Sequence, residues 1–258
     1  MAKATRDAAP PIAQPPHPVL EQYYASERER PLRVNEMFDA AAAEYDRVEN
    51  AMSLGTGKRY RRQALARAGL GAGMHVLDVG CGTGIVTQEA ARLVGAHGSV
   101  VAIDPSSGML AQAQQRAVAL AVQGVGERLP FADASFDVVC MGYALRHVAD
   151  LNAAFSEFRR VLRPRGFALL LEITAPQSRF EHALLKLYMK RIVPAISRIS
   201  RNGRAASRLM SYYWETVENC VPPLTIIDAL RRAGFEQVER KVEIGVFSTY
   251  RAVSVGSR

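Results

Sequence analysis

The sequence lacks the features that mark secreted and membrane-spanning proteins. Its three cysteines, Cys81, Cys140 and Cys220, are scattered rather than paired, which is typical of a reducing compartment and excludes a disulfide framework. No apolar run approaches the roughly 18 residues that span a bilayer. Residues 1–18 contain no apolar segment of the kind found in secretory signals. We therefore expect a cytoplasmic protein.

The overall composition is that of an ordinary globular chain. Hydrophobic residues make up 48% and charged residues 22% of the 258 positions, which excludes a disordered chain. Lysine and arginine outnumber aspartate and glutamate by 33 to 25, giving a net charge of +8. That excess favours an anionic partner without choosing between nucleic acid, membrane surface and small acids.

The proline content and the spacing of apolar residues change several times along the chain. Residues 1–18 hold five of the thirteen prolines, which predicts a disordered or polyproline tail. Within the expected main domain, residues 19–258, we expect a helical flap over 19–70 and a core over 71–175. A basic helical insertion (176–222) and a closing helix with two strands (223–258) would follow. The expected strands lie at residues 76–79, 100–103, 118–122, 136–141, 167–173, 238–244 and 247–253. Strands that alternate with helices indicate an open α/β sheet that is covered on both faces.

The most informative stretch is a glycine loop between an expected strand and an expected helix. Residues 76–84 read VLDVGCGTG, with glycines at Gly80, Gly82 and Gly84. Glycines let the backbone approach a ligand closely, and the helix that follows offers free N–H groups to an anion. Asp104 ends the next strand, where a carboxylate can accept hydrogen bonds from both hydroxyls of a ribose.

The spacing of these glycines differs from the dinucleotide fingerprint. That fingerprint is G-x-G-x-x-G, whereas here the spacing is G-x-G-x-G and Ile85 takes the place of the third fingerprint glycine. Asp78 precedes the loop by two residues, where its carboxylate can attract an ammonium group. An adenosyl amino acid carries such a group and a pyrophosphate does not.

This pattern resembles motif I, with its following acidic residue, of class I S-adenosylmethionine-dependent methyltransferases. Over roughly residues 33–253 the chain also resembles the ubiquinone/menaquinone biosynthesis C-methyltransferases. The segments that carry this second resemblance are Met37–Asp39, Tyr45–Asp46, Asn50, Met52–Gly55, Glu127–Phe131, Phe136–Asp137, Ala144–Val148, Arg160–Gly166 and Gly245–Val246.

The resemblance implies a Rossmann-like, seven-stranded and mostly parallel sheet with helices on both faces and a reversed last strand. It implies S-adenosyl-L-methionine as the cofactor, with its ribose at Asp104. The residues expected to bind the cofactor are Asp78, Gly80, Gly82, Thr83, Gly84, Asp104, Val125, Gly126 and Gly142.

Two departures from the family pattern concern adenine and the substrate. Val125 stands where relatives usually have an Asp or Asn that contacts the adenine amino group, so adenine would rely on backbone groups and apolar contact. One such hydrogen bond is worth about 0.5–1.5 kcal/mol, which weakens binding without abolishing it. The family's L-R-N is Leu145-Arg146-His147 here, and Gly142 replaces a serine.

Methylation at a phenol or quinol carbon calls for a base, or for a cation that stabilises the phenolate. Arg146 matches the family residue in this role and, being always protonated, would stabilise charge or orient water. His147 is our hypothetical base, the alternative being a helix-capping or surface histidine. Tyr45 is a candidate for closing over the methionine end of the cofactor. The Tyr212–Trp214 segment is a candidate lid over the site. For both, core packing is the alternative.

The insertion combines basic and apolar residues. Between residues 179 and 208 there are eight lysines and arginines against the single acid Glu181. This mixture fits an amphipathic helix on an anionic membrane surface, and equally a solvated helix face. We expect no nucleic-acid binding, because stacking aromatics on strands are missing. No metal site is expected, since His75, His97 and Cys140 lack ligand spacing.

Three functions remain open from the sequence. The leading one is an S-adenosylmethionine-dependent methyltransferase that acts on a carbon of a quinol or related aromatic, lipid-like substrate. The second is an O-, N- or C-methyltransferase of another small metabolite, and the third is a non-catalytic partner protein with the methyltransferase fold. The intact glycine loop and Asp104 argue against the third.

Overall fold

The protein forms a seven-stranded sheet. A computed structural model describes residues 13–53, 55–116, 120–176, 178–193, 195 and 203–255. The strand order is β3-β2-β1-β4-β5-β7-β6. β1 to β5 are parallel, and β7 runs antiparallel to both of its neighbours. The strands are β1 His75–Val79, β2 Ser99–Asp104, β3 Leu120–Gln123, β4 Phe136–Gly142, β5 Leu162–Ile173, β6 Phe235–Glu243 and β7 Phe247–Ser254.

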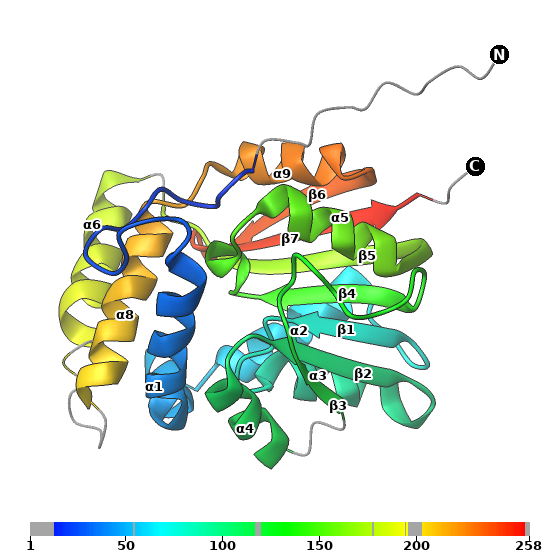
Figure 1. Ribbon diagram of the computed structural model, residues 1–258, viewed down its shortest axis with the longest axis horizontal. Helices are drawn as coiled ribbons and strands as arrows, with labels where there is room; N and C mark the ends of the chain where they lie inside the picture. The colour runs from blue at the N-terminus through cyan, green and yellow to red at the C-terminus, as the bar shows by residue number, and fades with distance from the viewer. Residues whose placement is uncertain are drawn as a thin grey trace.

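Helices cover both faces of this sheet. One face carries α2, α3 and α4, and the other carries α5 and α9. α1, α6 and α8 lie beside one another beyond the edge where the parallel strands end (Figure 1). The helices are α1 Arg30–Met52, α2 Gly57–Ala68, α3 Ile85–Val94, α4 Ser107–Gln115, α5 Leu151–Val161, α6 Arg179–Leu187, α8 Gly203–Glu218 and α9 Pro223–Arg232. Short 3-10 turns form η1 Gly95–His97 and η2 Leu145–His147, and η3 Tyr188–Ile192 is a π-helical turn.

The central strands are buried on both sides, as expected of a parallel sheet. In β1, Val76 packs with Leu65 of α2 in the apolar layer that continues into α1 and α8. The next residue, Leu77, faces the opposite layer, where it joins Phe155 of α5 and Leu230 of α9. The fold class predicted from the sequence, including the reversed last strand, is confirmed.

Two aspartates fix α1 across the carboxyl edge of the sheet. Oδ1 of Asp39 accepts hydrogen bonds from the Ser106 hydroxyl at 2.6 Å and from the Gly108 N–H at 2.8 Å, at the start of α4. About two turns further along, Asp46 accepts from the Thr83 hydroxyl at 2.5 Å and pairs with Arg116. α1 therefore forms a roof that is anchored to the loops after β1 and β2.

Some boundaries differ from those expected. β5 begins at Leu162 rather than at the expected residue 167, and so includes Pro164. The backbone accommodates this with Arg165 at φ 68° and a register shift in β4 between Phe136 and Val138. The expected third strand is displaced to Leu120–Gln123, and residues 117–119 lie outside the described residues.

Part of the predicted N-terminal tail packs against the domain. Residues 1–12 lie outside the described residues, but residues 13–18 pack against the domain. The Gln14 N–H donates to Asp150 Oδ1 at 3.0 Å, and His17 is only 1% exposed. Of the two alternatives predicted, disordered or polyproline, residues 13–18 are therefore not disordered, because their polar groups find partners in the folded domain.

Replacement of Asp39 by alanine tests the roof anchor. The substitution removes the acceptor of two hydrogen bonds at the start of α4, so we expect a loss of about 0.5–2 kcal/mol in the free energy of unfolding. Urea denaturation measures this loss. Glu36→Ala on the same helix is the control, because Glu36 pairs with Arg33 and both side chains are about half exposed (53% and 52%). Equal stability of the two variants would contradict the anchor.

Candidate active site

A cavity of about 510 Å³ lies beneath α1 at the carboxyl ends of β1, β2 and β4. This volume falls in the range of about 300–1,000 Å³ that is common for small-molecule sites. The position is where open α/β sheets bind their ligands. One end of the cavity is formed by the loops after β2 and β3. The other is formed by the glycine loop, α1, α2 and the turn after β4.

The glycine loop needs its glycines for two physical reasons. Gly80 and Gly82 have φ angles of 66° and 55°, a left-handed conformation that other residues rarely adopt. At Gly80 a Cβ would also lie 2.5 Å from the Ala144 Cβ. Gly80, Gly82 and Thr83 line the cavity, whereas Gly84, at the start of α3, does not. The loop thus brings backbone rather than side chains to a ligand.

Asp104 lines the cavity and is 7% exposed. Its Oδ2 accepts from the Gly82 N–H at 2.8 Å and its Oδ1 from the Ser106 N–H at 2.9 Å. Burial raises the pKa of the Asp104 carboxyl to about 6. The second strand is thereby tied to the glycine loop, and the carboxylate keeps lone pairs for a ligand hydroxyl.

Asp78 is oriented differently from the prediction. Its carboxylate accepts from the Thr87 hydroxyl at 2.6 Å and from the Cys140 thiol at 3.6 Å. It is fully buried and is not among the cavity-lining residues. Burial raises the pKa of Asp78 to about 7. The structure therefore does not bring Asp78 into contact range of a ligand ammonium group, and its carboxylate braces β1 against α3 and β4.

The loop after β3 forms the other end of the cavity. Val125 is 40% exposed there, and Gly126 fits tightly, since a Cβ would lie 3.1 Å from Val79 Cγ1. Gly142, across the cavity, is equally constrained, because its Cβ would lie 2.7 Å from Val86 Cγ2. As expected, Val125 offers no side-chain hydrogen bond, and only its backbone and methyl groups can contact a base.

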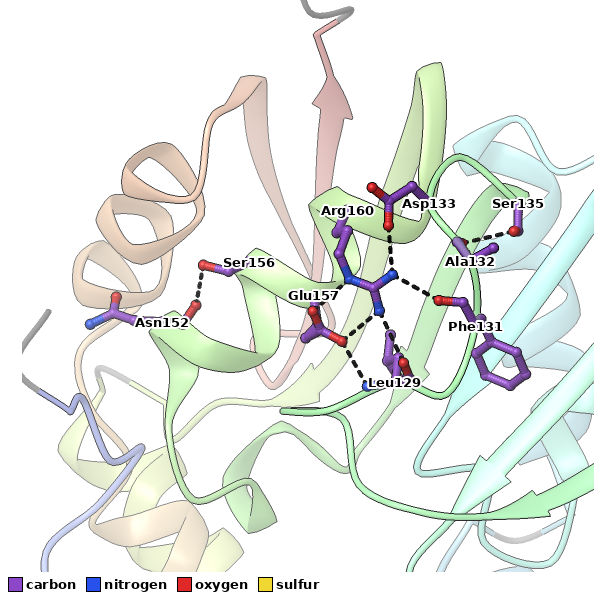
Figure 2. A network of polar contacts seen from close by, with 9 residues as sticks. All are labelled: Leu129, Phe131, Ala132, Asp133, Ser135, Asn152, Ser156, Glu157 and Arg160. Carbon is purple, nitrogen blue, oxygen red and sulfur yellow. Dashed lines mark hydrogen bonds and ion pairs between the residues drawn. The ribbon is translucent and has the colours of Figure 1, made fainter. Parts of the chain in front are cut away.

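Arg160 of α5 holds the continuation of this loop in place (Figure 2). Its guanidinium donates to the carbonyls of Leu129 at 3.0 Å and Phe131 at 2.7 Å. Glu157, one turn earlier, pairs with Arg160 at 2.7 Å and accepts from the Leu129 N–H at 2.7 Å. The family-like segments around residues 127–131 and 160–166 are thus joined, which fixes the loop that carries Val125.

Tyr45 and His147 both line the cavity. The two rings flank Phe38 of α1, with centroid distances of 6.3 Å from Phe38 to Tyr45 and 5.1 Å from Phe38 to His147. The Nδ1 atom of His147 lies 3.3 Å from the Tyr212 hydroxyl, and Nε2 is buried without a partner among the described residues. Burial and the charge of Arg146 hold the pKa of His147 well below its usual value, so the ring is neutral.

Arg146 does not reach the cavity. Its side chain is fully buried, pairs with Glu172 of β5, and lies 4.4 Å above the Tyr213 ring. The predicted direct role of Arg146 is therefore not supported by its position. It stabilises the turn that carries His147. Tyr213 likewise packs behind this turn rather than over the ligand site.

The same holds for the rest of the expected aromatic lid. Tyr212 and Trp214 are fully buried and do not line the cavity. Trp214 Nε1 donates to Glu218 at 3.0 Å within α8. The Tyr212–Trp214 segment is thus core packing, the alternative that the sequence left open. It meets His147 through the Tyr212 hydroxyl and the rings of Tyr212 and Tyr213.

Sequence reasoning missed Asn35, Phe38 and Arg61 among the polar and aromatic residues that line the cavity. Asn35 Oδ1 is buried without a partner among the described residues. Arg61 of α2 pairs with Glu49 at 2.7 Å. The helix GKRYRRQALARA contains five basic residues, and only the helix orientation shows that Arg61 faces the cavity.

The residues present fit S-adenosylmethionine. The glycine loop offers backbone groups, Asp104 an acceptor for ribose hydroxyls, and Asn35 Oδ1 an unsatisfied acceptor that an ammonium or amino group can use. In the part of the chain that the structure describes, no three His, Cys, Asp or Glu side chains group as metal ligands do. The absence of a metal stays a prediction.

Comparisons with known proteins agree with this reading. Residues 25–254 match the ubiE/COQ5 methyltransferase family. A demethylmenaquinone methyltransferase of Symbiobacterium thermophilum is 34% identical over 96% of this chain and 98% of its own. The ubiquinone/menaquinone biosynthesis C-methyltransferase UbiE of Pseudoalteromonas translucida is 31% identical over 82% of this chain and 86% of its own.

A solved structure shares the fold at lower identity. The S-adenosylmethionine-dependent methyltransferase of Thermotoga maritima, described as a possible histamine N-methyltransferase, superposes with a TM-score of 0.59 at 20% identity. It covers 86% of this chain and 99% of that one. With the family match over most of its length, the chain belongs to the ubiE/COQ5 methyltransferase family and is an S-adenosylmethionine-dependent methyltransferase.

Proposed function

We propose that the protein transfers a methyl group to a ring carbon of a quinol, of the demethylated polyprenyl type that its curated relatives are named for. The observation that carries the proposal is the chamber under α1. There, the aromatic rings of Phe38, Tyr45 and Tyr143 and the partnerless Nε2 of His147 meet the glycine loop. A flat, apolar ring with a hydroxyl group fits such a lining.

The cofactor end of the cavity has a separate set of residues. When bound, S-adenosylmethionine supplies a methyl group on a sulfonium. Gly80 and Gly82 present backbone to its methionine part, Asp104 accepts from its ribose, and Val125 and Gly126 contact its adenine through backbone and methyl groups. Asp46, through the Thr83 hydroxyl, keeps the roof closed over this end.

His147 removes the proton that limits the nucleophilicity of the quinol. A quinol carbon becomes nucleophilic when the adjacent hydroxyl is deprotonated. With the Nδ1 proton donated to the Tyr212 hydroxyl, Nε2 of the neutral ring has a free lone pair. The hydroxyl proton moves to Nε2 and passes to bulk water when the products leave, and the proton that the methyl group displaces from the ring carbon returns to the hydroxyl oxygen. Phe38 and Tyr45 exclude water, which strengthens the electrostatic contacts inside.

The activity is tested with a short-chain demethylmenaquinol under anaerobic conditions. We expect a product methylated on ring carbon, identified by mass spectrometry and NMR. We expect His147→Ala to lower kcat by about a hundredfold or more. His182→Ala is the matched control, because His182 lies on α6 outside the cavity. Exclusive O-methylation, or no turnover with any quinol, would contradict the proposal.

Asp104 gives a pH dependence to cofactor binding. Its pKa of about 6 is raised, so the carboxyl takes up a proton as the pH falls from 7 to 5. A protonated carboxyl loses acceptor sites for ribose hydroxyls. We therefore expect calorimetric affinity for S-adenosylhomocysteine to be constant above pH 7 and to fall below pH 6. Asp104→Asn should bind about tenfold more weakly and without this pH dependence. An unchanged pH profile in Asp104→Asn would assign the titration to another group.

We also propose that the protein contacts a membrane surface through residues 179–208. On α6, Phe180, Leu184 and Leu187 are 78%, 58% and 55% exposed and share one helix face. Ile244, in the turn between β6 and β7, is 84% exposed, and its neighbour Gly245 approaches Glu181. These four residues form an apolar surface that fits the acyl region of a bilayer, where a polyprenyl substrate resides.

The positive charge beside this surface is smaller than the sequence count suggests. Lys186 pairs with Glu218 at 2.5 Å, and Lys190 with Glu215 at 3.1 Å. Arg198 and Arg201 lie outside the described residues. In the part of the chain that the structure describes, no helix is both long and apolar enough to cross a membrane. The apolar residues therefore carry most of the proposed contact.

Vesicle sedimentation tests the membrane contact. We expect the protein to sediment with vesicles that contain anionic lipid, and the double variant Phe180→Ser/Leu184→Ser to lose most of this binding. Leu224→Ser is the control, because Leu224 is 70% exposed on α9, away from α6. Equal sedimentation of wild type and double variant would place any membrane contact elsewhere.

A further inference from the structure

The cavity contains one fixed positive charge. Arg61 of α2 is the single lysine or arginine among the described residues that line it. The acidic residues that also line it are Asp104, Glu127 and Asp150, and His147 is neutral. The end of the cavity beneath Tyr45 is therefore the place where an anion would be stabilised.

The guanidinium of Arg61 is held without using all of its donors. Nη1 donates to Glu49 Oε1 at 2.7 Å, and the guanidinium carbon lies 4.8 Å above the centre of the Tyr143 ring. Neither Nε nor Nη2 has a hydrogen bond within the described part of the chain. Neither is among the buried unpaired atoms, and Arg61 is one of the residues that line the cavity.

The surrounding backbone is shaped to admit this side chain. A Cβ at Gly57 would lie 2.6 Å from both Arg61 Nη1 and Glu49 Oε1, so any other residue there would shift the ion pair. Tyr143 has a φ of 62°, which is strained for a residue with a side chain. This conformation turns its ring beneath the guanidinium. Strain of this kind persists where the surrounding structure enforces it, often at ligand sites.

We propose that Arg61 is the oxyanion receptor of the active site and binds a carboxylate or a phenolate through its free Nε and Nη2 donors. The proposal rests on the proposed function, because it assigns the charge-stabilising role within that same cavity. The planar guanidinium fork matches two-oxygen anions and phenolate oxygens better than a lysine would. It also supplies the cation that the buried Arg146 does not bring to the site.

Two ligands could provide this oxyanion. One is the carboxylate of the methionine part of the cofactor, and the other is an ionised hydroxyl of the quinol. In the second case Arg61 lowers the pKa of the quinol hydroxyl, which allows a neutral histidine of low pKa such as His147 to accept its proton. The two sources make different demands on Arg61 and can be separated by binding experiments that need no turnover.

The first arm uses pairs of cofactor analogues. Calorimetry compares S-adenosylhomocysteine, which has the carboxylate, with methylthioadenosine, which lacks it. The second arm uses a hydroxynaphthoquinone whose ionised form absorbs visible light, so that both its affinity and its pKa in the site can be followed spectroscopically.

The variants separate a loss of ligand binding from a loss of folding. Arg61→Lys keeps the charge but loses the fork, and Arg61→Gln/Glu49→Gln removes both partners together and leaves no unpaired buried charge. Arg62→Gln is the matched control, because the neighbouring Arg62 is 51% exposed, pairs with Glu89 and does not line the cavity. Thermal melting confirms that each variant is folded.

We expect the double variant to bind the oxyanion ligand about ten to a hundred times more weakly, Arg61→Lys to be intermediate, and Arg62→Gln to match wild type. Loss confined to the hydroxynaphthoquinone, with a raised pKa of its bound hydroxyl, assigns the receptor to the substrate. Loss confined to S-adenosylhomocysteine assigns it to the cofactor. Unchanged binding of both ligands overturns the proposal. A wild type that binds neither ligand contradicts the proposed function itself.

Discussion

The structure depends on one crossing helix and the two carboxylates that anchor it. α1 passes over the edge where β1, β2 and β4 end, and Asp39 and Asp46 fasten it to the start of α4 and to Thr83. Without this roof the cavity would be an open crevice of the kind that doubly wound sheets share. With it, two reactants can be held together in a space from which water is excluded.

The fold and the cofactor end of the site were predictable because backbone requirements specify them. The glycines at Gly80 and Gly82 are needed for positive φ angles, and the alternation of apolar strands with helices implies a parallel sheet. The side-chain directions were not predictable. Asp78 has the sequence position of a ligand-binding carboxylate, but it accepts a hydrogen bond from the Thr87 hydroxyl behind the loop. Arg146 forms a buried ion pair with Glu172 and does not reach the cavity. These outcomes depend on tertiary packing, which a motif does not record.

Arg61 is the converse case: it lines the cavity although no sequence motif indicated it. It lies among several basic residues on a helix whose charge pattern is typical of a solvated surface, and no motif distinguishes it from Arg62. The orientation of α2 buries the first and exposes the second (9% and 51% exposed side chains). The cavity therefore combines three groups of different charge: the Arg61 cation, the buried Asp104 carboxylate, and the neutral His147 imidazole beside Phe38 of α1.

The most direct test is a crystal structure of the protein with S-adenosylhomocysteine and a demethylmenaquinol analogue bound. We expect the cofactor between Gly80 and Asp104, the quinol ring beneath Phe38 and Tyr45, and a quinol oxygen within hydrogen-bond distance of His147 Nε2. An analogue bound outside the chamber under α1, or a cofactor with no contact to Asp104, would contradict this expectation.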